Sequence, residues 1–509
     1  MSQPVLAAEE LAGLVSRCLL DPGFFCETVL RSPPDDWQLE AMQALADIER
    51  HRRGLPTVIN HEGLNRVTVR SGHGTGKTNW LARTVHWWQF THYQGLVPCT
   101  APKERQLLTR LWPELRRVMA KAPVWYKRFV EIKVGGTALW ARDPIWQAVV
   151  ETASAPENLA GYHAPFLLFV IDEASAERLD AMFPAIEGAL TTEGAALAMI
   201  GNPTRARGEF WASHQKRGVR EMYFKMHITP DRAQRPGLEV WAERMIRKYG
   251  RASPVVQVRV FGEFAELAEN QLLPLDWVVA ARERAWEGGG SVPRLRVAVD
   301  VADGGDDETV VTVAELYEDH TRYLRQRRYS FPPSEAPIMA GDAAVALYAA
   351  YGGDKTRGDD IVVDAMGVGA GTAGYVMRQG YPVVQYRGGA ASDDNKRWRN
   401  RRVQTYLYYR DALREGRLSY ADGYYADEGD WDDHDAQAAS IRVKPGTERV
   451  EDLESKEDMK RRGVKSPDMI DSEVMILAGG APVIGAAPGD EEELLEGAAL
   501  TSDIGDWEG

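Results

Sequence analysis

The stretch RSGHGTGKTNW, which begins at Arg70, carries residue types that can bind a phosphate group. The P-loop pattern ends in Gly-Lys-Ser/Thr, because backbone N–H groups wrap the phosphates while the lysine reaches their oxygens and the hydroxyl binds Mg²⁺. Gly76, Lys77 and Thr78 match this ending, but Ser71 stands at the first glycine of the pattern. The stretch is therefore either a phosphate-binding loop or only a flexible connection. The residues of such a loop would be Arg70, Ser71, Gly72, His73, Gly74, Thr75, Gly76, Lys77 and Thr78.

A pair of acids after an apolar run favours the first interpretation. In LLFVIDEAS, Asp172 and Glu173 directly follow the run. A buried parallel strand ending there would present one carboxylate to Mg²⁺ and the next to an attacking water, which is the Walker B arrangement. A helix-capping aspartate after a core strand is the alternative. Because the P-loop pattern and the acidic pair occur in this order, the sequence favours an NTPase.

Two further segments fit a nucleotide site. Gln38 follows Trp37 upstream of the loop and is a candidate for binding adenine, or else an ordinary exposed polar residue. Asn202 and Thr204 follow another apolar run in MIGNPTR. They are suited to sensing the γ-phosphate, and a simple turn is the alternative.

Four aspartates in the second half of the chain could hold metal ions. Asp300 ends RVAVD, Asp364 ends DIVVD, and Asp468 and Asp471 begin the helical stretch SPDMIDSEVM. Aspartate is disfavoured within strands, so its place in two apolar strands is informative. Two-metal hydrolysis of a phosphodiester needs several converging carboxylates. A helix N-cap at Asp468 and a solvated first-turn acid at Asp471 remain alternatives.

The elements that must position these residues alternate between strands and helices in the first half. A strand, loop and helix are expected in RVTVRSGHGTGKTNWLARTVHWWQF. Further strands are expected in GLVPCTA, PIWQAVVETA, PFLLFVIDEAS and GAALAMIGNPTR, with helices such as RQLLTRLWPELRRVM between them. This alternation predicts an α/β fold with a largely parallel sheet covered on both faces.

A second domain follows a glycine-rich break near Pro293. RLRVAVDVADGGDDETVVTVAELY predicts two strands joined by an acidic turn, and DIVVDAMG and PVVQYRGG predict two more. Helices are expected near RRVQTYLYYRDALREG and DMIDSEVMILAGG. The predicted organisation is N-terminal helices with an ATPase domain at 1–265, a linker at 266–293, a second domain at 294–480 and an acidic flexible tail at 481–509.

Composition narrows the class of protein. The 509 residues are 44% hydrophobic and 27% charged, which predicts a soluble, multi-domain globular chain. The net charge of −14 argues against a generic polycation that coats nucleic acid, but not against local DNA contacts. The three cysteines lack CxxC spacing, which predicts a reducing compartment and no structural zinc. The sequence shows neither a signal peptide nor a membrane span, so a cytoplasmic protein is expected.

In their order, these motifs resemble the large terminase subunit of tailed bacteriophages, the motor-nuclease that packages DNA into procapsids. The resemblance extends from about Asp35 to Leu477. It implies an ASCE-type P-loop ATPase domain followed by an RNase H/RuvC-like nuclease domain. The motifs that carry it are DDWQLEAM, RSGHGTGKT, TAPKERQ, VIDEAS, GNPTR, VAVDVADGGDDETVV, VVDAMGVGAG and ESKEDMKRRGVKSPDMID.

The resemblance also implies roles for the ATPase residues. Lys77 and Thr78 would hold phosphate and Mg²⁺, Asp172 would support Mg²⁺, and Glu173 would activate water. Arg70 resembles the family's P-loop arginine. Asn202 and Thr204 lie in GNPTR, which resembles the motif coupling hydrolysis to DNA movement.

In the nuclease domain, the resemblance implies that Asp300, Asp364 and Asp468 bind two Mg²⁺ or Mn²⁺ ions. Asp471 competes with Asp468 for the third position. Ser472, which follows it, stands where the family often has alanine.

Contacts with DNA are harder to place. KRWRNRRVQTYLYYR interleaves cations with aromatics and could track a DNA backbone. An amphipathic helix that packs Val403, Tyr406 and Leu407 inward is the alternative, and both can hold. Arg105 and Arg142 are candidates for an arginine finger acting between subunits. The candidate DNA-binding residues are Lys396, Arg397, Trp398, Arg399, Arg401 and Arg402.

The expected function is ATP-driven translocation of double-stranded DNA into procapsids, with metal-dependent cleavage of concatemeric DNA. By resemblance, the partners are DNA, the small terminase subunit, the portal of the procapsid and further copies of this chain in a ring. The place of action would be the host cytoplasm, with transient docking at the portal. A helicase-nuclease of DNA repair and an ATP-gated docking protein without nuclease activity are the alternatives.

Overall fold

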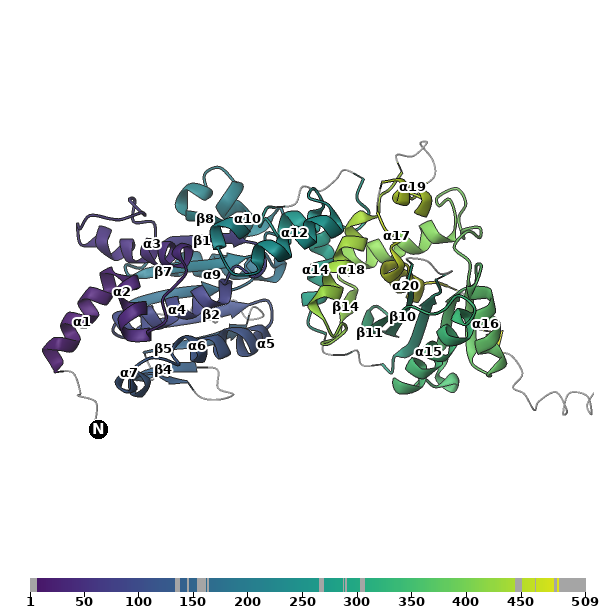
Figure 1. The fold of residues 1–509 in the computed structure, drawn as a ribbon, viewed down its shortest axis with the longest axis horizontal. Helices are drawn as coiled ribbons and strands as arrows, with labels where there is room; N and C mark the ends of the chain where they lie inside the picture. The colour runs from purple at the N-terminus through teal and green to yellow at the C-terminus, as the bar shows by residue number, and fades with distance from the viewer. Residues whose placement is uncertain are drawn as a thin grey trace, which may run out of the picture. The chain divides into compact units, whose positions relative to one another are not determined.

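The chain forms two compact units, Met1–Glu266 and Leu267–Gly509, in a computed structural model (Figure 1). The structure describes residues 7–132, 138–143, 146–152, 162, 164–264, 270–286, 288, 291–302, 307–444, 451–462, 464–479 and 483–484. The predicted acidic tail, apart from 483–484, lies outside the described residues, as does the side chain of Arg142.

The first unit is built on an eight-stranded sheet in the order β3-β4-β5-β2-β6-β7-β1-β8. Pairing is parallel from β5 through β8, and antiparallel only between β3, β4 and β5. The predicted parallel-rich α/β fold is confirmed. The strands are β1 (Arg66–Ser71), β2 (Gly95–Ala101), β3 (Glu131–Ile132), β4 (Ala138–Asp143), β5 (Trp146–Thr152), β6 (Phe166–Ile171), β7 (Ala195–Gly201) and β8 (Phe224–Ile228).

The central strands carry the predicted nucleotide motifs to one edge of this sheet. β7 pairs with both β1 and β6, so one strand separates the P-loop strand from the acidic-pair strand, as in ASCE ATPases. The carboxyl ends of parallel strands meet at the same edge. The loops that follow β1, β6 and β7 therefore gather there.

Apolar side chains cover both faces of this sheet. Along β6, Leu168 and Val170 belong to one buried cluster, whereas Leu167 and Phe169 belong to another. This alternation is that of a strand buried on both sides. The first cluster packs against α1 (Ala8–Leu20), η1 (Phe25–Leu30), α3 (Asp36–Arg52), α4 (Lys77–Thr91), α6 (Trp112–Val118) and α7 (Val124–Phe129); the second packs against η3 (Glu177–Met182), α9 (Phe183–Ala189) and α10 (Gly208–Gln215).

Shorter elements complete the first unit. α3 begins after Asp35, which is its N-cap, and Gln38 accepts a hydrogen bond from the Asp35 backbone N–H at 3.1 Å. The helix expected in RQLLTRLWPELRRVM is instead divided by a π-helical turn, η2 (Leu107–Leu111). The remaining elements are α2 (Pro22–Phe24), α5 (Glu104–Gln106), η4 (Arg220–Met222), α11 (Pro230–Ala233), α12 (Leu238–Tyr249) and α13 (Pro254–Arg259).

The second unit contains a mixed sheet in the order β14-β11-β10-β9-β12-β13-β15. β10 runs antiparallel to β9 and β11, while β12 is parallel to β9 and β13. When β9 to β13 are counted as strands one to five, their order in the sheet is three-two-one-four-five, and the second strand is antiparallel. This is the RNase H-like arrangement that the resemblance implies. The strands are β9 (Arg294–Asp300), β10 (Thr309–Leu316), β11 (Thr321–Tyr329), β12 (Asp360–Asp364), β13 (Pro382–Tyr386), β14 (Leu418–Tyr420) and β15 (Val483–Ile484).

Besides the short strand β14, two elements of this sheet differ from the sequence expectation. β11, TRYLRQRRY, is rich in arginine and was not among the expected strands. β15 lies within the segment assigned to the tail, yet it pairs with β13. Long-range pairing, rather than local apolar pattern, places both strands.

Helices also pack against both faces of the second sheet. One buried cluster joins Ala298 and Val362 to the helices that contain the predicted DNA segment and Asp468. The other joins Val297 and Val363 to two different helices. The first group comprises α14 (Leu275–Glu283), α17 (Arg401–Arg414), α18 (Glu428–Ser440), α19 (Lys456–Arg461) and α20 (Asp468–Ile476); the second comprises α15 (Ala336–Ala350) and α16 (Gly369–Arg378), and η5 (Lys355–Arg357) precedes β12.

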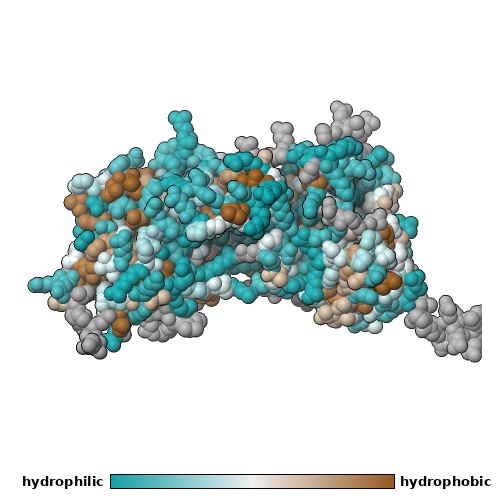
Figure 2. All heavy atoms as spheres, in the orientation of Figure 1, coloured by the Kyte–Doolittle hydropathy of each residue, from teal (hydrophilic) through white to brown (hydrophobic). Residues whose placement is uncertain are grey.

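The surface is mostly hydrophilic on the face seen in Figure 2, with separate small apolar patches on each unit. Large apolar side chains exposed on the molecule include Tyr93, Val240 and Ile338. Among the helices that the structure describes, none is long and apolar enough to cross a membrane.

Two candidate active sites

The P-loop of the first unit connects the end of β1 to the start of α4. Gly74 and Gly76 have φ of 71° and 94°, left-handed values that favour glycine. The Lys77 ammonium donates hydrogen bonds to Asn202 Oδ1 at 2.7 Å and to the Gly72 carbonyl at 2.9 Å. Lys77 is also the first residue of α4, and a lysine at a helix N-terminus suits phosphate.

Ser71 departs from the P-loop pattern without disturbing the loop. Its hydroxyl lies 3.0 Å from the Thr75 hydroxyl inside the turn, and both side chains are buried. Gly72 has less freedom, since an added Cβ would lie 2.3 Å from the Val260 carbonyl oxygen. Close approach of two backbones therefore requires glycine at position 72 rather than at 71. The His73 N–H donates to the Arg259 carbonyl at 2.6 Å.

The acidic pair follows β6 as the sequence predicts. Asp172 is buried, and its carboxylate accepts a hydrogen bond from the Glu173 backbone N–H at 3.0 Å. Burial and the Glu173 carboxylate raise the pKa of Asp172 and the Lys77 ammonium opposes them, which together leave the pKa raised to about 7. Glu173 has a φ of 50°, an uncommon backbone conformation for a residue with a side chain. Its carboxylate lies 3.9 Å from the Arg110 guanidinium, an interaction that the sequence did not indicate.

The other predicted nucleotide-site residues lie in different surroundings. Gln38 is fully buried, not exposed, and its amide donates to the Gly76 carbonyl at 3.0 Å. Arg70 forms an ion pair with Glu263, so its guanidinium is already engaged in this state. Asn202 donates to the Ser71 carbonyl at 3.0 Å, whereas Thr204 donates to the Ser175 hydroxyl at 3.1 Å. Thr78 lies in the first turn of α4. Roles in adenine binding and coupling remain predictions.

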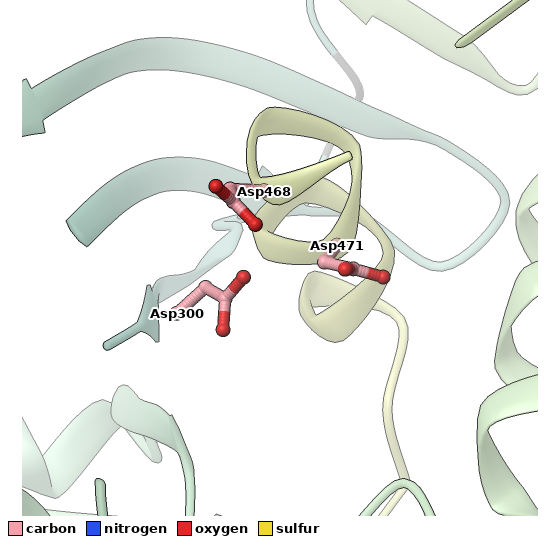
Figure 3. Close-up of side chains that lie close together, drawn as sticks. All are labelled: Asp300, Asp468 and Asp471. Carbon is pink, nitrogen blue, oxygen red and sulfur yellow. The ribbon is translucent and has the colours of Figure 1, made fainter. Parts of the chain in front are cut away.

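Three aspartates converge in the second unit. Asp300 ends β9, and Asp468 and Asp471 lie on α20 (Figure 3). One oxygen from each carboxylate lies within 4.8 Å of the others. Spacing of three residues places Asp468 and Asp471 on one face of the helix. Such oxygen ligands suit Mg²⁺ or Mn²⁺.

Asp364 is a neighbour of this group but not part of it. It ends β12, which pairs in parallel with β9 so that Val363 lies opposite Val299. Burial raises the pKa of Asp364, Lys456 opposes this and Asp471 adds to it, which together leave the pKa raised to about 6. One of its buried oxygens has no hydrogen-bond partner among the described residues. This free oxygen is available for a cation.

A cation of the chain itself lies among these carboxylates. The Lys456 ammonium lies 2.8 Å from Asp471, 3.8 Å from Asp468 and 4.0 Å from Asp300. Lys456 begins α19, and no role is predicted for it from the sequence. A lysine upstream of two helical aspartates is too weak a signal to show this contact. Because the Lys456 ammonium lies where the three carboxylates converge, their arrangement suits a positive charge.

Asp468 and Asp471 differ in their protein contacts. Asp471 accepts a hydrogen bond from Tyr406 at 2.5 Å and lies 3.7 Å from Arg402. Asp468 accepts a hydrogen bond from the Glu308 N–H at 3.3 Å. Both acids are buried and neither caps α20, whose N-cap is Pro467. The helix-cap and solvated-acid alternatives are therefore wrong, although the choice of third ligand stays open.

Charge in this site depends on burial and on neighbours. Burial raises the pKa of Asp300 well above its usual range; Lys456 opposes this, and the other aspartates add to it. For Asp471, burial raises the pKa, but Lys456 and Arg402 outweigh it and leave the pKa below its usual range. Cations thus stabilise Asp471 as a carboxylate.

The predicted DNA segment divides into an exposed loop and a packed helix. Lys396, Arg397 and Arg399 are exposed, while Trp398 is buried. α17 begins at Arg401 and buries Val403, Tyr406 and Leu407, as the amphipathic alternative predicts. Arg402 is half-buried near Asp471. Of the two arginine-finger candidates, Arg105 is exposed on α5, and the side chain of Arg142 lies outside the described residues.

Comparison of the sequence with curated proteins finds a relative among bacteriophage proteins. Over 428 residues, 80% of this chain and 83% of the relative, the sequence is 25% identical to an Enterobacteria phage P7 protein described as "Probable terminase, large subunit". The resemblance to large terminase subunits is confirmed. No protein-family model matches the chain.

Two solved large terminase structures are similar to this chain at low sequence identity. The large terminase of a thermophilic bacteriophage, in complex with ADP, is 14% identical and has a TM-score of 0.41; the match covers 87% of this chain and 98% of that one. The nuclease domain of the large terminase subunit gp2 of bacterial virus Sf6 is 20% identical and has a TM-score of 0.35; it covers 41% of this chain and 99% of that one.

Proposed function

We propose that this chain is the ATPase and nuclease subunit of a bacteriophage DNA-packaging motor. ATP hydrolysis in the first unit would drive double-stranded DNA into a procapsid, and the second unit would cut concatemeric DNA. The observation that carries the proposal is the presence of a P-loop with an acidic pair and a separate carboxylate cluster in one terminase-like chain.

The first unit has the groups that in-line hydrolysis of ATP requires. Lys77 and the amides of the P-loop would bind the phosphates, and Thr78 and Asp172 would hold Mg²⁺ that arrives with ATP. Glu173 follows Asp172 and would orient the attacking water. Asn202 already contacts the Lys77 ammonium, so a phosphate that takes Lys77 would also change the contacts of the loop after β7. This gives a physical route from hydrolysis to movement.

The second unit has oxygen ligands for phosphodiester hydrolysis. Asp300, Asp364 and Asp468 would hold two Mg²⁺ or Mn²⁺ ions, with Asp471 as the competing third ligand. When bound, these ions supply a water of lowered pKa and stabilise charge on the phosphodiester. Lys456 must leave the centre of the cluster for a metal to enter, because its ammonium now lies among the same carboxylates. The exposed cations Lys396, Arg397 and Arg399 would contact the DNA backbone.

The proposed partners follow from packaging. They are double-stranded DNA, a small terminase subunit, the portal of a procapsid and further copies of this chain in a ring. The proposed place of action is the host cytoplasm, with the subunit docked transiently at the portal.

The test separates the two activities. Purified protein is incubated with plasmid DNA and Mg²⁺ or Mn²⁺, and wild type is compared with Asp300→Asn and Asp364→Asn. We expect both variants to lose cleavage while they keep ATP hydrolysis. Absence of cleavage by the wild type under either metal would contradict the nuclease proposal and favour the docking protein. Strand separation on a forked duplex without portal or procapsid would favour the helicase-nuclease.

A further inference from the structure

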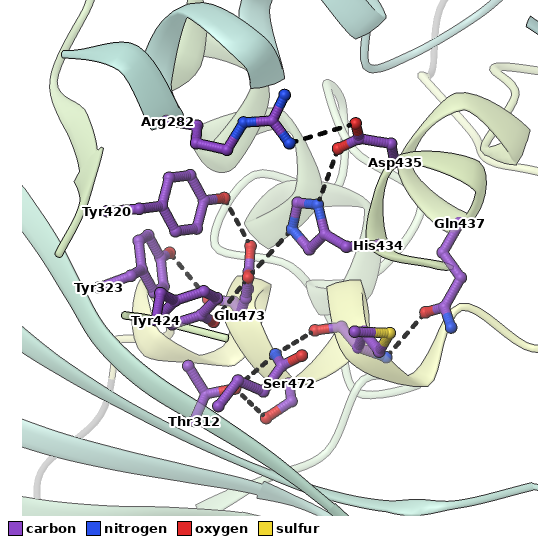
Figure 4. A network of polar contacts seen from close by, with 12 residues as sticks. Arg282, Thr312, Tyr323, Tyr420, Tyr424, His434, Asp435, Gln437, Ser472 and Glu473 are labelled. Carbon is purple, nitrogen blue, oxygen red and sulfur yellow. Dashed lines mark hydrogen bonds and ion pairs between the residues drawn. The ribbon is translucent and has the colours of Figure 1, made fainter. Parts of the chain in front are cut away.

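Glu473 is a buried acid on α20 that the proposed chemistry does not use. One carboxylate oxygen accepts hydrogen bonds from Tyr409 at 2.6 Å and Tyr420 at 2.9 Å. The other accepts one from Tyr424 at 2.7 Å and lies 3.1 Å from His434 Nε2. Four side chains from α17, α18, β14 and the turn after it thus fix one carboxylate. Figure 4 shows Tyr420, Tyr424 and His434 around Glu473.

Charges alternate outward from Glu473. His434 Nδ1 lies 3.3 Å from Asp435, whose second oxygen lies 3.6 Å from Arg282. Burial lowers the pKa of His434, but Glu473 and the hydrogen bonds to both acids outweigh it and raise the pKa to about 9. Burial raises the pKa of Glu473, and His434 and the tyrosines outweigh it, so the pKa stays below its usual value. At neutral pH this is a buried ion pair.

The same region also fixes the backbone of α20. Tyr323 donates to the Glu473 carbonyl at 3.0 Å. Gln326 donates to the Met469 carbonyl at 2.9 Å, and the Met469 N–H donates to Gln437 at 2.9 Å. The Ser472 hydroxyl lies 2.8 Å from that of Thr312. Polar contacts with β10, β11 and α18 therefore restrict sliding and rotation of α20.

Stability alone does not explain a buried charge at this position. Well-packed apolar side chains in place of a buried ion pair are often neutral or stabilising. α20 already buries Met469, Ile470 and Val474. An apolar side chain would tolerate several small rotations of the helix, whereas a carboxylate with four fixed partners tolerates one. Rotation matters here because Asp468 and Asp471 share the opposite, site-facing part of α20.

We propose that Glu473 is a positioning residue that fixes the rotation and axial position of α20, so that Asp468 and Asp471 converge with Asp300. The inference rests on the proposed function in one respect, namely that these aspartates hold divalent cations. Groups that orient metal ligands without touching the metal typically change metal affinity by about 10- to 100-fold when they are mutated.

The test measures Mn²⁺ binding to the full chain by calorimetry, with thermal unfolding as a second readout. We expect Glu473→Gln to weaken Asp300-dependent Mn²⁺ binding about 10- to 100-fold and to leave the KM for DNA unchanged. Excess Mn²⁺ should restore part of the kcat for DNA cleavage in Glu473→Gln. Asp359→Asn is the matched control, because Asp359 is a buried acid of the same unit that accepts hydrogen bonds from the Leu295 and Asp354 amides.

Each outcome decides the role of Glu473. Unchanged Mn²⁺ affinity in Glu473→Gln, or an equal loss in Asp359→Asn at equal loss of stability, would overturn the proposal. If Glu473→Gln does not fold, Tyr424→Phe, which removes one hydroxyl, must weaken Mn²⁺ binding in the same direction, and no change there would overturn it. If the wild type binds Mn²⁺ but cuts no DNA, the nuclease function is contradicted. The Mn²⁺ affinities of Glu473→Gln and Asp359→Asn would still decide the role of Glu473. Absence of Asp300-dependent Mn²⁺ binding by the wild type would overturn both.

Discussion

The two candidate sites use opposite ways of holding charge. In the first unit, one contiguous loop presents a lysine, and Asn202 and a backbone carbonyl hold its ammonium. In the second unit, acids from the strand β9 and the helix α20 surround Lys456. The first site is a cationic cradle for an anion that arrives from outside. The second is an anionic cluster whose charge a lysine of the chain balances, and under the proposed function a metal would take the place of that lysine.

This contrast indicates where each site is sensitive. The P-loop is a local structure, since its glycines and the start of α4 fix most of its amides. The carboxylate cluster depends on the relative placement of β9, β12 and α20, and therefore on contacts far from the cluster, such as those of Glu473. Changes remote from the ligands should affect the second site more than the first.

The largest expected effect is a loss of ATP hydrolysis that leaves DNA cleavage intact. Glu173→Gln should reduce ATP hydrolysis by about 10²- to 10⁴-fold, because an amide cannot accept the proton of the attacking water. ATP binding and metal-dependent DNA cleavage should persist. The measurement is steady-state phosphate release, with Glu177→Gln as the matched control, since Glu177 is an exposed acid nearby. Retained DNA-stimulated hydrolysis in Glu173→Gln would contradict the assigned role.

A smaller effect should distinguish the two helical aspartates. Asp468→Asn should weaken Mn²⁺ binding about 100-fold and Asp471→Asn about 10-fold, as orders of magnitude for a ligand and for a residue that positions it. The reason is that Tyr406 and Arg402 already engage Asp471, whereas Asp468 is freer to bind metal. Calorimetry on both variants measures this. The reverse order would make Asp471 the third ligand.

The role of Lys456 as a balancing charge predicts a gain rather than a loss. Lys456→Met should bind Mn²⁺ about 10-fold more tightly, because the metal no longer displaces an ammonium; this corresponds to about 1.4 kcal/mol. Lys460→Met, which removes an exposed lysine paired with Asp307 at 3.2 Å, should leave the affinity unchanged. Weaker binding in Lys456→Met would instead mean that the lysine organises the carboxylates.

The smallest effect concerns stability against pH. The pKa of His434 is raised to about 9 in the folded chain from an ordinary value of 6.5, so its stabilising contribution is complete below about pH 6.5 and is lost as pH rises through 9. The unfolding free energy of the wild type should exceed that of His434→Gln by on the order of 1–3 kcal/mol at pH 6. The difference should shrink by pH 10. Chemical denaturation at both pH values checks this, and a constant difference would show that His434 is not charged.

Much of the framework follows from local sequence patterns. Apolar runs predict β1, β2, β6 and β7, and the strand, glycine loop and helix around Lys77 follow directly because a P-loop is contiguous. Asp300 and Asp364 are visible as acids that end apolar strands. These features depend on neighbouring residues, which a linear sequence displays.

The meeting of distant groups, in contrast, becomes visible only in the folded chain. β11 is rich in arginine, and its place in the sheet comes from pairing with β10 and β14, which no local pattern displays. The same holds for Lys456 among the aspartates, Arg110 beside Glu173, and the tyrosines around Glu473. Residue types, and most of the strands and helices that carry them, follow from the sequence alone. Their convergence depends on long-range packing, because the charge that each acid meets is set by segments far away in the chain.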